Sequence, residues 1–521
     1  MDSPFLSGPP EVTLIDATDK PYDTAVAAAR TCYSANGIVL PDQVSGTRKA
    51  RTVRDRIASS TLTAGHLTTR QHATFIFGID KVSRAAVWSF LHGHPFYNSE
   101  QVSQRYVEVQ PGTYVVPKLE PHADAVYGAT VQMQIEAYQL LIKLLGPTIR
   151  DEFHALFPAR ANRPDRWERF LERKAYEIAR YVLPIATYTH LYHTVSALTL
   201  MRYARMRDYI DFPAETALLV NAMLDAVLEI DPDFERELDD PFPLEETPEY
   251  AFIASRSDVV GAAAAHHQEF DNELGGLPSL LIDYPANAQE TLAKAVRSVL
   301  GESSASLSTE DAIALVLNPA KNPHLADMLG PTTMSKLTRA LAVVTYVFQK
   351  KLSHTADSQD QRHRMVPSTA PVLAATYTGI PDVVMPTLIG MNERAQELFE
   401  RVIKQTTEGI NKLLEMGVPT EFALYLLPNA HAVRKVSSGT LANLLPKGRQ
   451  RLCYAAQEEI FHAMAAEAAQ VTAKHPAIGQ WLHAPCRLRQ QASETPYCPE
   501  GTRFCGVPVW KLDVHEFDRV L

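Results

Sequence analysis

The chain has 521 residues, of which 46% are hydrophobic and 21% charged, so it can bury a sizeable core. Its formal net charge of -10 argues against a broad, non-specific nucleic-acid surface, which needs a basic face, but it permits a local anion site made by a few arginines. Residues 1–12 lack the basic and apolar regions of a signal peptide, and no apolar run is long enough to cross a bilayer, so we expect neither secretion nor a membrane.

Helical periodicity dominates the chain. Strand-like runs are few, and in chain order they are 13–16, 74–79, 113–116 and 280–283. Helical patterns are longer, and they cover 81–91, 123–145, 166–181, 214–228, 336–352, 387–416 and 448–474. This pattern predicts the α+β class, with long helices packed on small sheets.

An internal repeat runs through the sequence. Residues 14–30 match 281–297 without a gap, and both segments read as a strand, a turn and a helix. Residues 179–184 match 423–428 at a slightly shorter separation. At that separation two charged residues recur, Arg207 as Arg451 and Glu215 as Glu459. The period is too long for a solenoid, so the pattern predicts duplication of a whole domain.

The duplication predicts the domain organisation. A first repeat would span 1–240 and a second, diverged repeat 279–480. Between them, 241–278 begins with prolines and carboxylates that suit an exposed linker, and 481–521 forms a cysteine-containing tail.

Polar residues gather in the first repeat at 64–72 and 90–106. In the second of these segments, Ser103-Gln104-Arg105 follows a predicted helix and a short loop. A serine and main-chain N–H groups hold phosphate oxygens, and arginine clamps them with two hydrogen bonds. A surface serine beside a salt-bridged arginine gives the same pattern, so the triplet alone does not decide the function.

Five motifs together resemble the flavin-dependent thymidylate synthase family. In chain order they are 28–34 (Ala-Ala-Arg-Thr-Cys-Tyr-Ser), 65–72 (Gly-His-x-Thr and a later His), 103–106 (Ser-Gln-Arg-Tyr), 179–184 (Ala-Arg-x-Val-Leu-Pro) and 200–207 (Leu-Met up to Arg). The similarity covers roughly 12–228, and a weaker copy covers 279–470. The chain is identified as a tandem fusion of two such domains.

The resemblance implies a reaction in which dUMP becomes dTMP with FAD, NADPH and methylenetetrahydrofolate. It implies these nucleotide-binding residues: Ser103 and Arg105 at the phosphate, Arg180 at the pyrimidine edge, and Arg207 on the nucleotide. Ser103 and Arg180 are the expected catalytic residues, since a cation near the uracil carbonyls stabilises charge as C5 becomes nucleophilic. The reduced flavin carries the one-carbon unit and the hydride, so no protein nucleophile is needed, and Cys32 is expected in the core.

The flavin side departs from the family pattern. The resemblance implies flavin contacts from His66, Thr68 and either His92 or His94. The family has Arg-His-Arg near His92 and His94, where this chain reads Leu-His-Gly-His-Pro at 91–95. Ser196 stands where asparagine is usual. Flavin chemistry is therefore less well supported than nucleotide binding.

The second repeat departs further. Its predicted helix 336–352 runs into 353–364, and anchoring on Gln361-Arg362 places Arg362 opposite Arg105 and Asp360 opposite Ser103. In that alignment Arg362-His363-Arg364 is not the family's Arg-His-Arg. Leu424 replaces the first repeat's Arg180. We interpret this repeat as a partner half, and the sequence leaves open whether it turns over.

The partner half could complete the site of the first. The residues it would lend are Lys350, Lys351, Arg362 or Arg451. Since the resemblance implies sites shared by the subunits of a homotetramer, two fused chains would pair as a homodimer that forms a pseudo-tetramer.

Cysteine usage bears on location and metals. Five cysteines, one of them far from the rest, form no disulfide framework, so a cytoplasmic setting is expected. His483, Cys486, Cys498 and Cys505 are zinc-type ligands, although separate buried cysteines fit the loose spacing equally. His92 and His94 lack a clear third ligand. No metal is therefore assigned.

Three functions remain open at this point. The first is methylation of dUMP with reduced flavin. The second is a nucleotide-binding homologue that has lost flavin catalysis, and the third is a flavin enzyme acting on another pyrimidine nucleotide.

Overall fold

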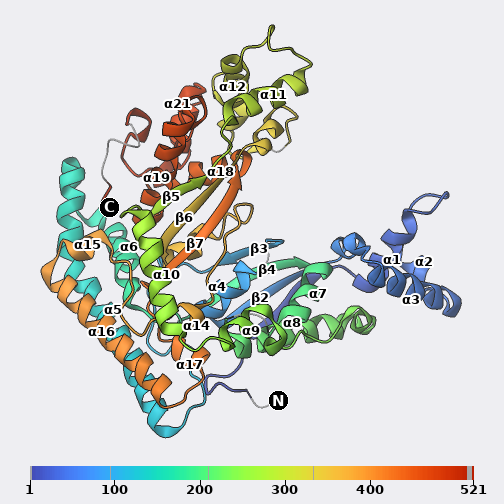
Figure 1. Cartoon of the computed structure of the whole chain (residues 1–521), viewed down its shortest axis with the longest axis horizontal. Coiled ribbons are helices and arrows are strands. Elements are labelled where there is room, and N and C mark those ends of the chain that lie inside the picture. Colours follow the sequence, from blue (N-terminus) through green and yellow to red (C-terminus); the bar gives the residue numbers. More distant parts are fainter. Residues whose placement is uncertain (1–2, 94, 163, 209–210, 332–333, 513–518) are drawn as a thin grey trace.

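The computed structural model describes residues 3–93, 95–162, 164–208, 211–331, 334–512 and 519–521. They form two units, each a small antiparallel sheet with helices around it (Figure 1). The α+β prediction and the tandem arrangement are confirmed. No helix in these described ranges combines the length and the apolar character that a membrane span needs.

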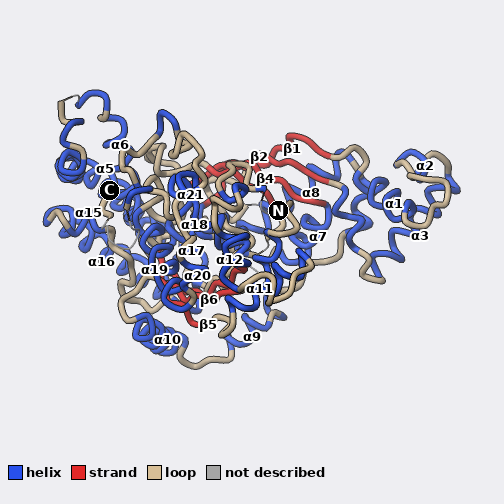
Figure 2. Tube along the Cα trace, turned by 90° about the horizontal axis from the view of Figure 1, so that it is seen from above, coloured by secondary structure: helices blue, strands red, loops and turns tan. Residues whose placement is uncertain are grey.

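The first sheet has the order β1-β2-β4-β3, and every neighbouring pair is antiparallel. Its strands are β1 (Glu11–Ala17), β2 (Thr74–Ser83), β3 (Tyr97–Gln101) and β4 (Tyr188–Ser196). The helices of this repeat are α1 (Pro21–Thr31), α2 (Pro41–Ser45), α3 (Arg48–Thr63), α4 (Arg84–His92), α5 (Pro121–Leu156), α6 (Glu168–Ala179), α7 (Ala197–Met206) and α8 (Pro213–Ile230). Helices α1 to α3 project away from the body (Figures 1 and 2).

The second sheet has the order β5-β6-β7 and repeats the first three positions of the first sheet. Its strands are β5 (Ser279–Asp283), β6 (Thr345–Ser353) and β7 (Ala432–Thr440). Its helices are α11 (Ala288–Leu300), α12 (Thr309–Leu317), α13 (His354–Asp360), α14 (Leu373–Thr376), α15 (Thr387–Gly390), α16 (Glu393–Glu415), α17 (Thr420–Leu424), α18 (Leu441–Arg451), α19 (Glu458–Lys474) and α20 (Pro476–Gly479). Helices α9 (Pro248–Ala254) and α10 (Val259–Leu274) lie in the segment predicted as a linker, and α21 (Pro485–Gln491) lies in the predicted tail.

The largest hydrophobic core cluster takes side chains from both repeats, whereas a second large cluster is formed by buried residues between 288 and 509. Helices α5 and α16 pack along each other, and the core cluster takes side chains from both, such as Tyr138 and Leu141 from α5 and Val402 from α16 (Figure 1). Because this cluster is continuous across the two repeats, each repeat buries part of its apolar surface against the other.

A pseudo-two-fold relation governs how the repeats meet. Pro184 bridges Pro428, which is the same position of the other repeat. Main-chain hydrogen bonds flank this point in symmetric pairs, Ile185 N to Leu427 O with Asn429 N to Leu183 O, and Ala186 N to Tyr425 O with Ala430 N to Tyr181 O, at 2.8 to 3.0 Å. The contact between 181–187 and 425–431 is termed the seam.

Side chains repeat the same relation. The Ser83 hydroxyl caps α4 and donates to Glu215 at 2.6 Å, and Tyr425 of the other repeat donates to the same carboxylate at 2.6 Å. In the second repeat the hydroxyls of Ser353, which caps α13, and of Tyr181 donate to Glu459. Ser83 and Ser353 are therefore equivalent positions.

One predicted helix is wrong. Residues 336–352 contain a short 3-10 helix (Thr338–Val343) followed by strand β6. Strand β6 buries residues on both faces, so its sequence shows no apolar-polar alternation and resembles a buried helix. The predicted helix 448–474 is likewise two helices, α18 and α19, separated at 452–457.

Candidate functional site

The Ser103–Arg105 segment follows β3 and reaches the second repeat. The Arg105 guanidinium pairs with Glu177 through Nε, and its Nη2 donates to the carbonyl of Ala455 at 3.0 Å. Lys174 also pairs with Glu177, at 2.8 Å. Burial alone would raise the pKa of Glu177, but the charges of Arg105 and Lys174 hold it well below its ordinary value. Arg105 is thus held at the boundary between the repeats.

Arg180 also faces the second repeat. It lies at the end of α6, where it is 4% exposed, and its Nη2 donates to Oε1 of Gln457 at 3.2 Å. The Gln457 amide in turn donates to Tyr181 at the seam. Ala455 and Gln457, two positions apart in the chain, therefore bind both arginines of the first repeat.

The cap positions correct the expected alignment of the second repeat. Counting forward in step from Ser83 and Ser353, Arg362 stands opposite His92, and Asp360 stands opposite Phe90. The prediction that Arg362 matches Arg105 and that Asp360 matches Ser103 is therefore wrong. Arg362-His363-Arg364 instead follows its helix directly, at the positions where the resemblance expects Arg-His-Arg. The described residues after it form no counterpart of β3, and this missing strand caused the misalignment.

Arg362, His363 and Arg364 lie along β3 of the first repeat. Nη2 of Arg362 pairs with Glu100 at 2.6 Å, and Nη2 of Arg364 donates to Asn98 at 2.9 Å. Two strips from different repeats therefore run side by side, one leading to Ser103 and one carrying the arginines.

Arg451 is held beneath this strip. Its Nε donates to Nε2 of His363 at 2.8 Å, and its Nη2 donates to the carbonyl of Gln359. Burial and then the charge of Arg451 lower the pKa of His363 to about 2, so the ring stays neutral and accepts this hydrogen bond. Burial also lowers the pKa of Arg451 to about 10, and the cations of Arg362 and Arg105 add to the decrease. Several guanidinium groups thus converge where an anion would relieve their repulsion.

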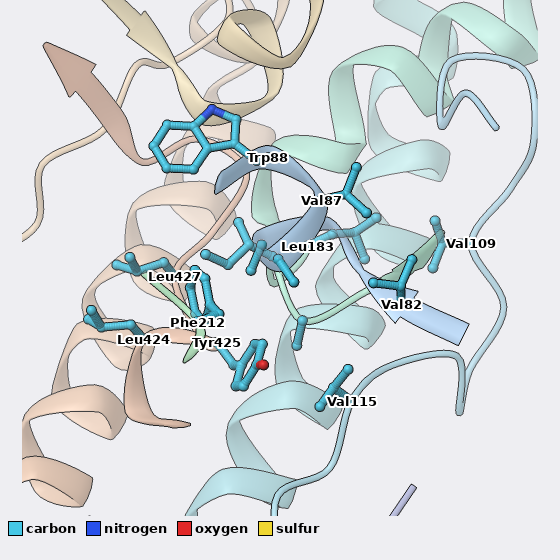
Figure 3. Close-up of a cluster of buried hydrophobic side chains, with 14 of the residues drawn as sticks. Val82, Val87, Trp88, Val109, Val115, Leu183, Phe212, Leu424, Tyr425 and Leu427 are labelled. Carbon is cyan, nitrogen blue, oxygen red and sulfur yellow. The ribbon is translucent and has the colours of Figure 1, made fainter. Parts of the chain in front are cut away.

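The position related to Arg180 by the two-fold symmetry of the seam is filled by apolar side chains and is termed the closed side. Leu424 stands in the place of Arg180 and is 2% exposed (Figure 3). Leu373, Tyr377 and Phe212 are buried in the same core cluster, and the main-chain N–H of Leu373 donates to Asp211 at 2.9 Å. Apolar side chains therefore occupy the equivalent of the arginine site.

Arg207 belongs to this closed side. Its Nη1 donates to Asn221 at 2.6 Å, and its Nε lies 3.7 Å from Asp208, both in its own repeat. Its counterpart Arg451 instead lies near Arg105 and Arg362, on the side opposite the closed one. Arg207 as a nucleotide-binding residue stays a prediction.

A cavity of about 440 Å³ adjoins the arginine strip. Residues of both repeats line it, among them Gln71, Tyr97, Asn98, Ser196, Arg202 and Arg364. Asn98 and Arg364 belong to the two strips described above, so the cavity lies at the β3 end of the strip that leads to Ser103. Its polar, cationic and apolar walls could accept a flat ring carrying a phosphate group.

The predicted flavin residues lie in different surroundings. His66 and Thr68 are exposed at the start of the 3-10 helix Leu67–His72, whose later residue Gln71 lines the cavity. Nε2 of His92 is 2.8 Å from Asp357, and its ring packs edge-on against Trp88. His94 lies outside the described residues.

A family comparison decides the identity. The sequence model of the family described as thymidylate synthase complementing protein matches residues 13–233 and 280–477, which correspond to the two repeats. The chain belongs to this flavin-dependent thymidylate synthase family. It is accordingly an enzyme of the methyltransferase class, built as a tandem fusion.

Individual relatives match about one repeat. The flavin-dependent thymidylate synthase of Clostridium tetani is 27% identical over 225 residues, covering 43% of this chain and 84% of that protein. That of Nitratidesulfovibrio vulgaris is 27% identical over 226 residues, with the same shares.

Solved structures give weaker likenesses. A UMP/dUMP methylase from Streptomyces cacaoi bound with 5-Br dUMP is 19% identical, with a TM-score of 0.31, and covers 44% of this chain and 93% of that one. The flavin-dependent thymidylate synthase of Helicobacter pylori complexed with FAD and dUMP is 22% identical, with a TM-score of 0.30, and covers 44% and 100%.

In this thymidylate synthase homologue the second repeat contains a buried charge network. Its members are Lys350, Lys435, Lys447, Asp357, Asp360 and Glu467, each at most 5% exposed. Lys350 pairs with Glu467 at 2.6 Å, and Asp360 accepts from Lys435 at 2.9 Å and from Lys447 at 3.0 Å. The expectation that Lys350 serves the nucleotide site is therefore replaced by a role in this network.

The first repeat has uncharged, mostly apolar side chains at the equivalent positions. Strand register and the matching caps pair the network with Ile79, Leu191, Tyr203, Val87, Phe90 and Met223, all of which are buried. Sequence reasoning missed the network, because Lys350 and Lys435 stand beside the charged residues Lys351 and Arg434 and give no clear signal of burial. Lys351 lies outside it and pairs with Asp271 at 2.7 Å.

All five cysteines are free thiols. Within the described ranges, no group of three or more His, Cys, Asp or Glu side chains is arranged to hold a metal ion, and this includes the set His483, Cys486, Cys498 and Cys505. Burial raises the pKa of Cys486 to about 12 and that of Cys505 to about 11, so both stay protonated. Cys32 is exposed, so its expected place in the core is wrong.

Proposed function

We propose that this chain converts dUMP to dTMP with FAD, taking the one-carbon unit from methylenetetrahydrofolate and reducing equivalents from NADPH, at one nucleotide site per chain. The observation that carries the proposal is the convergence of Ser103, Arg105 and Arg180 of the first repeat with Arg362 and Arg451 of the second.

The nucleotide side supplies charge and hydrogen bonds. Ser103, Arg105 and Arg451 would bind the phosphate of dUMP, since guanidinium groups form paired hydrogen bonds with phosphate oxygens. Arg180 would face the uracil carbonyls. Its fixed, buried cation would stabilise the negative charge that develops there as C5 attacks, without the reorganisation that water requires.

The cavity beside the strip suits FAD. Arg364 and Arg202 would hold its pyrophosphate, and Asn98 and Ser196 offer polar contacts to its ring system. When bound, FAD supplies hydride chemistry and carries the one-carbon unit. His66, Thr68, His92 and His94 remain predictions for this cofactor.

Assembly and location belong to the same proposal. Tyr33, Ile38 and Leu40 in the projecting helical segment are 93%, 78% and 58% exposed, and this surface suits contact with a second chain. A homodimer of fused chains would form a pseudo-tetramer. The free cysteines fit a reducing, cytoplasmic location.

The test is a reconstituted assay. Purified protein is loaded with FAD, its visible flavin spectrum is recorded, and dTMP formation from dUMP is measured with methylenetetrahydrofolate and NADPH, with Arg180→Lys as the matched control. We expect a bound flavin, dTMP formation and loss of turnover in the control. Binding of dUMP by a protein that takes up no FAD would indicate a nucleotide-binding homologue instead. Turnover only with another pyrimidine nucleotide would indicate a different flavin enzyme.

A further inference from the structure

Three consecutive residues of the second repeat each bind an arginine. The carbonyl of Ala455 accepts from Arg105, the carbonyl of Ala456 accepts from Nη2 of Arg519, and the amide oxygen of Gln457 accepts from Arg180. Arg105 and Arg180 belong to the proposed nucleotide site. Arg519 comes from the end of the sequence, far from both repeats' motifs.

Arg519 is held by hydrogen bonds through Nε and Nη2 and by two aromatic rings, while Nη1 has no hydrogen-bond partner among the described residues. It is 2% exposed, and its guanidinium lies 4.9 Å from the ring centre of Tyr454 and 5.0 Å from that of Phe461. Its Nε donates to the main-chain oxygen of Leu521 at 2.8 Å, and its own carbonyl is 2.9 Å from Nε2 of His462. A side chain held in this way restrains what it binds.

The electrostatic surroundings connect Arg519 to the same site. Burial lowers its pKa, and the carboxylate of Glu177, the partner of Arg105, opposes that decrease. Arg105 and Lys174 also lie close enough to interact with its charge. Arg519 therefore contributes to the charge balance around Glu177 without reaching the cavity side.

We propose that Arg519 is a positioning residue for the nucleotide site, resting on the function proposed above. By holding Ala456 it fixes the 455–457 segment, and this segment places Arg105 and Arg180 at the distance that a nucleotide needs. A mobile segment would leave both arginines to be ordered when dUMP binds, which costs affinity. Turnover of bound dUMP would be little changed.

The experiment compares Arg519→Met and Arg519→Lys with wild type as FAD-loaded, full-length protein. Dissociation constants for dUMP are measured by calorimetry, together with KM and kcat. Loss of a hydrogen bond to a charged donor predicts a KM for dUMP about ten-fold higher in Arg519→Met, with kcat within about two-fold. Lysine keeps the charge and one donor, so about a three-fold increase is expected.

A matched control and the contrary outcomes complete the design. Arg487 donates to the carbonyl of Leu512 at 2.9 Å, a contact of the same kind away from the 455–457 segment, so Arg487→Ala should leave KM unchanged. If Arg519→Met does not fold, Arg519→Lys decides, and an unchanged KM, or a fall in kcat alone, overturns the positioning role. Wild-type protein that does not bind dUMP would instead overturn the proposed function.

Discussion

Pro184 and Pro428 pair with each other across the seam, and each is the same position of its own repeat. A contact between equivalent residues lies on a two-fold axis, as in a symmetric dimer. The fused chain thus folds on itself in the way that two separate copies would associate. One consequence is that each potential site takes residues from both repeats.

The stoichiometry of nucleotide binding follows from the difference between the two symmetry-related positions, Arg180 and Leu424. Titration of the FAD-loaded protein with dUMP should give one site per chain, because Leu424 replaces Arg180 on the closed side and apolar side chains fill it. Leu424→Arg should not add a second site, since a buried cation there would lack a partner. Binding of two equivalents would contradict the assignment.

Removing an arginine from either repeat should disable the same site. We expect Arg180→Gln and Arg451→Gln each to lower kcat/KM for dUMP about 100-fold, as for loss of a fixed cation that stabilises a transition state. The double variant should lose less than the product of the two effects, because both act on one bound nucleotide. Fully independent effects in steady-state kinetics would place the two residues at different sites. Arg487→Gln, which removes the hydrogen bond to the carbonyl of Leu512 away from the site, is the matched control.

The buried charge network should be sensitive to single changes. Asp360→Asn removes one of the three carboxylates that balance the three buried lysines. Because removing one partner of a buried ion pair leaves the other charge unpaired, we expect a loss of about 3–5 kcal/mol of unfolding free energy. Denaturant unfolding measures this loss. Replacing both partners of one pair by their apolar counterparts, Lys350→Ile with Glu467→Met, should cost much less than the single change, because no buried charge is left without its partner.

Stability should decrease in mild acid through His354. This side chain is 1% exposed, and neither ring nitrogen has a hydrogen-bond partner in the part of the chain that the structure describes. Burial lowers its pKa to about 3, although Asp357 opposes the decrease. Between pH 6.5 and 3 the unfolded chain binds a proton that the folded chain does not, so stability present above pH 6.5 falls by about 1.4 kcal/mol per pH unit for this group.

The measurement is the free energy of denaturant unfolding between about pH 7.5 and 4.5, a range that brackets the titration of an unfolded histidine at about 6.5. His354→Phe should reduce the slope of unfolding free energy against pH, while His66→Phe, at an exposed position, should not. Equal slopes in all three proteins would show that His354 is not the group responsible.

Much of the architecture could be predicted because it is local or repeated. The duplication was visible in 14–30 and 281–297, and the family in motifs such as Ser103–Tyr106, and the family match confirms both. Strand β6 could not be recognised, because a strand buried on both faces lacks the alternation that distinguishes it from a helix.

The division of the site between repeats was harder to predict. The match of Arg362 to Arg105 relied on a shared Gln-Arg pair, and only the capping serines Ser83 and Ser353 reveal that a strand is missing after α13. The site also depends on which repeat faces which, and this is decided by the seam, a tertiary contact without a sequence signature. Arg519 was missed for the same reason.

The hydrogen bond from Trp88 to Asp357, at 2.7 Å, determines which halves are compatible. Val87 is the first repeat's counterpart of Asp357, so two first repeats would leave the indole N–H against a side chain that cannot accept it. Two second repeats would place Ser358 where the indole belongs and Arg362 in place of His92, so Asp357 would lose the packing of Trp88 but keep polar partners, among them Lys435 of its own repeat. The first repeat therefore needs the second repeat as its partner, and joining the two in one polypeptide supplies them in equal amounts.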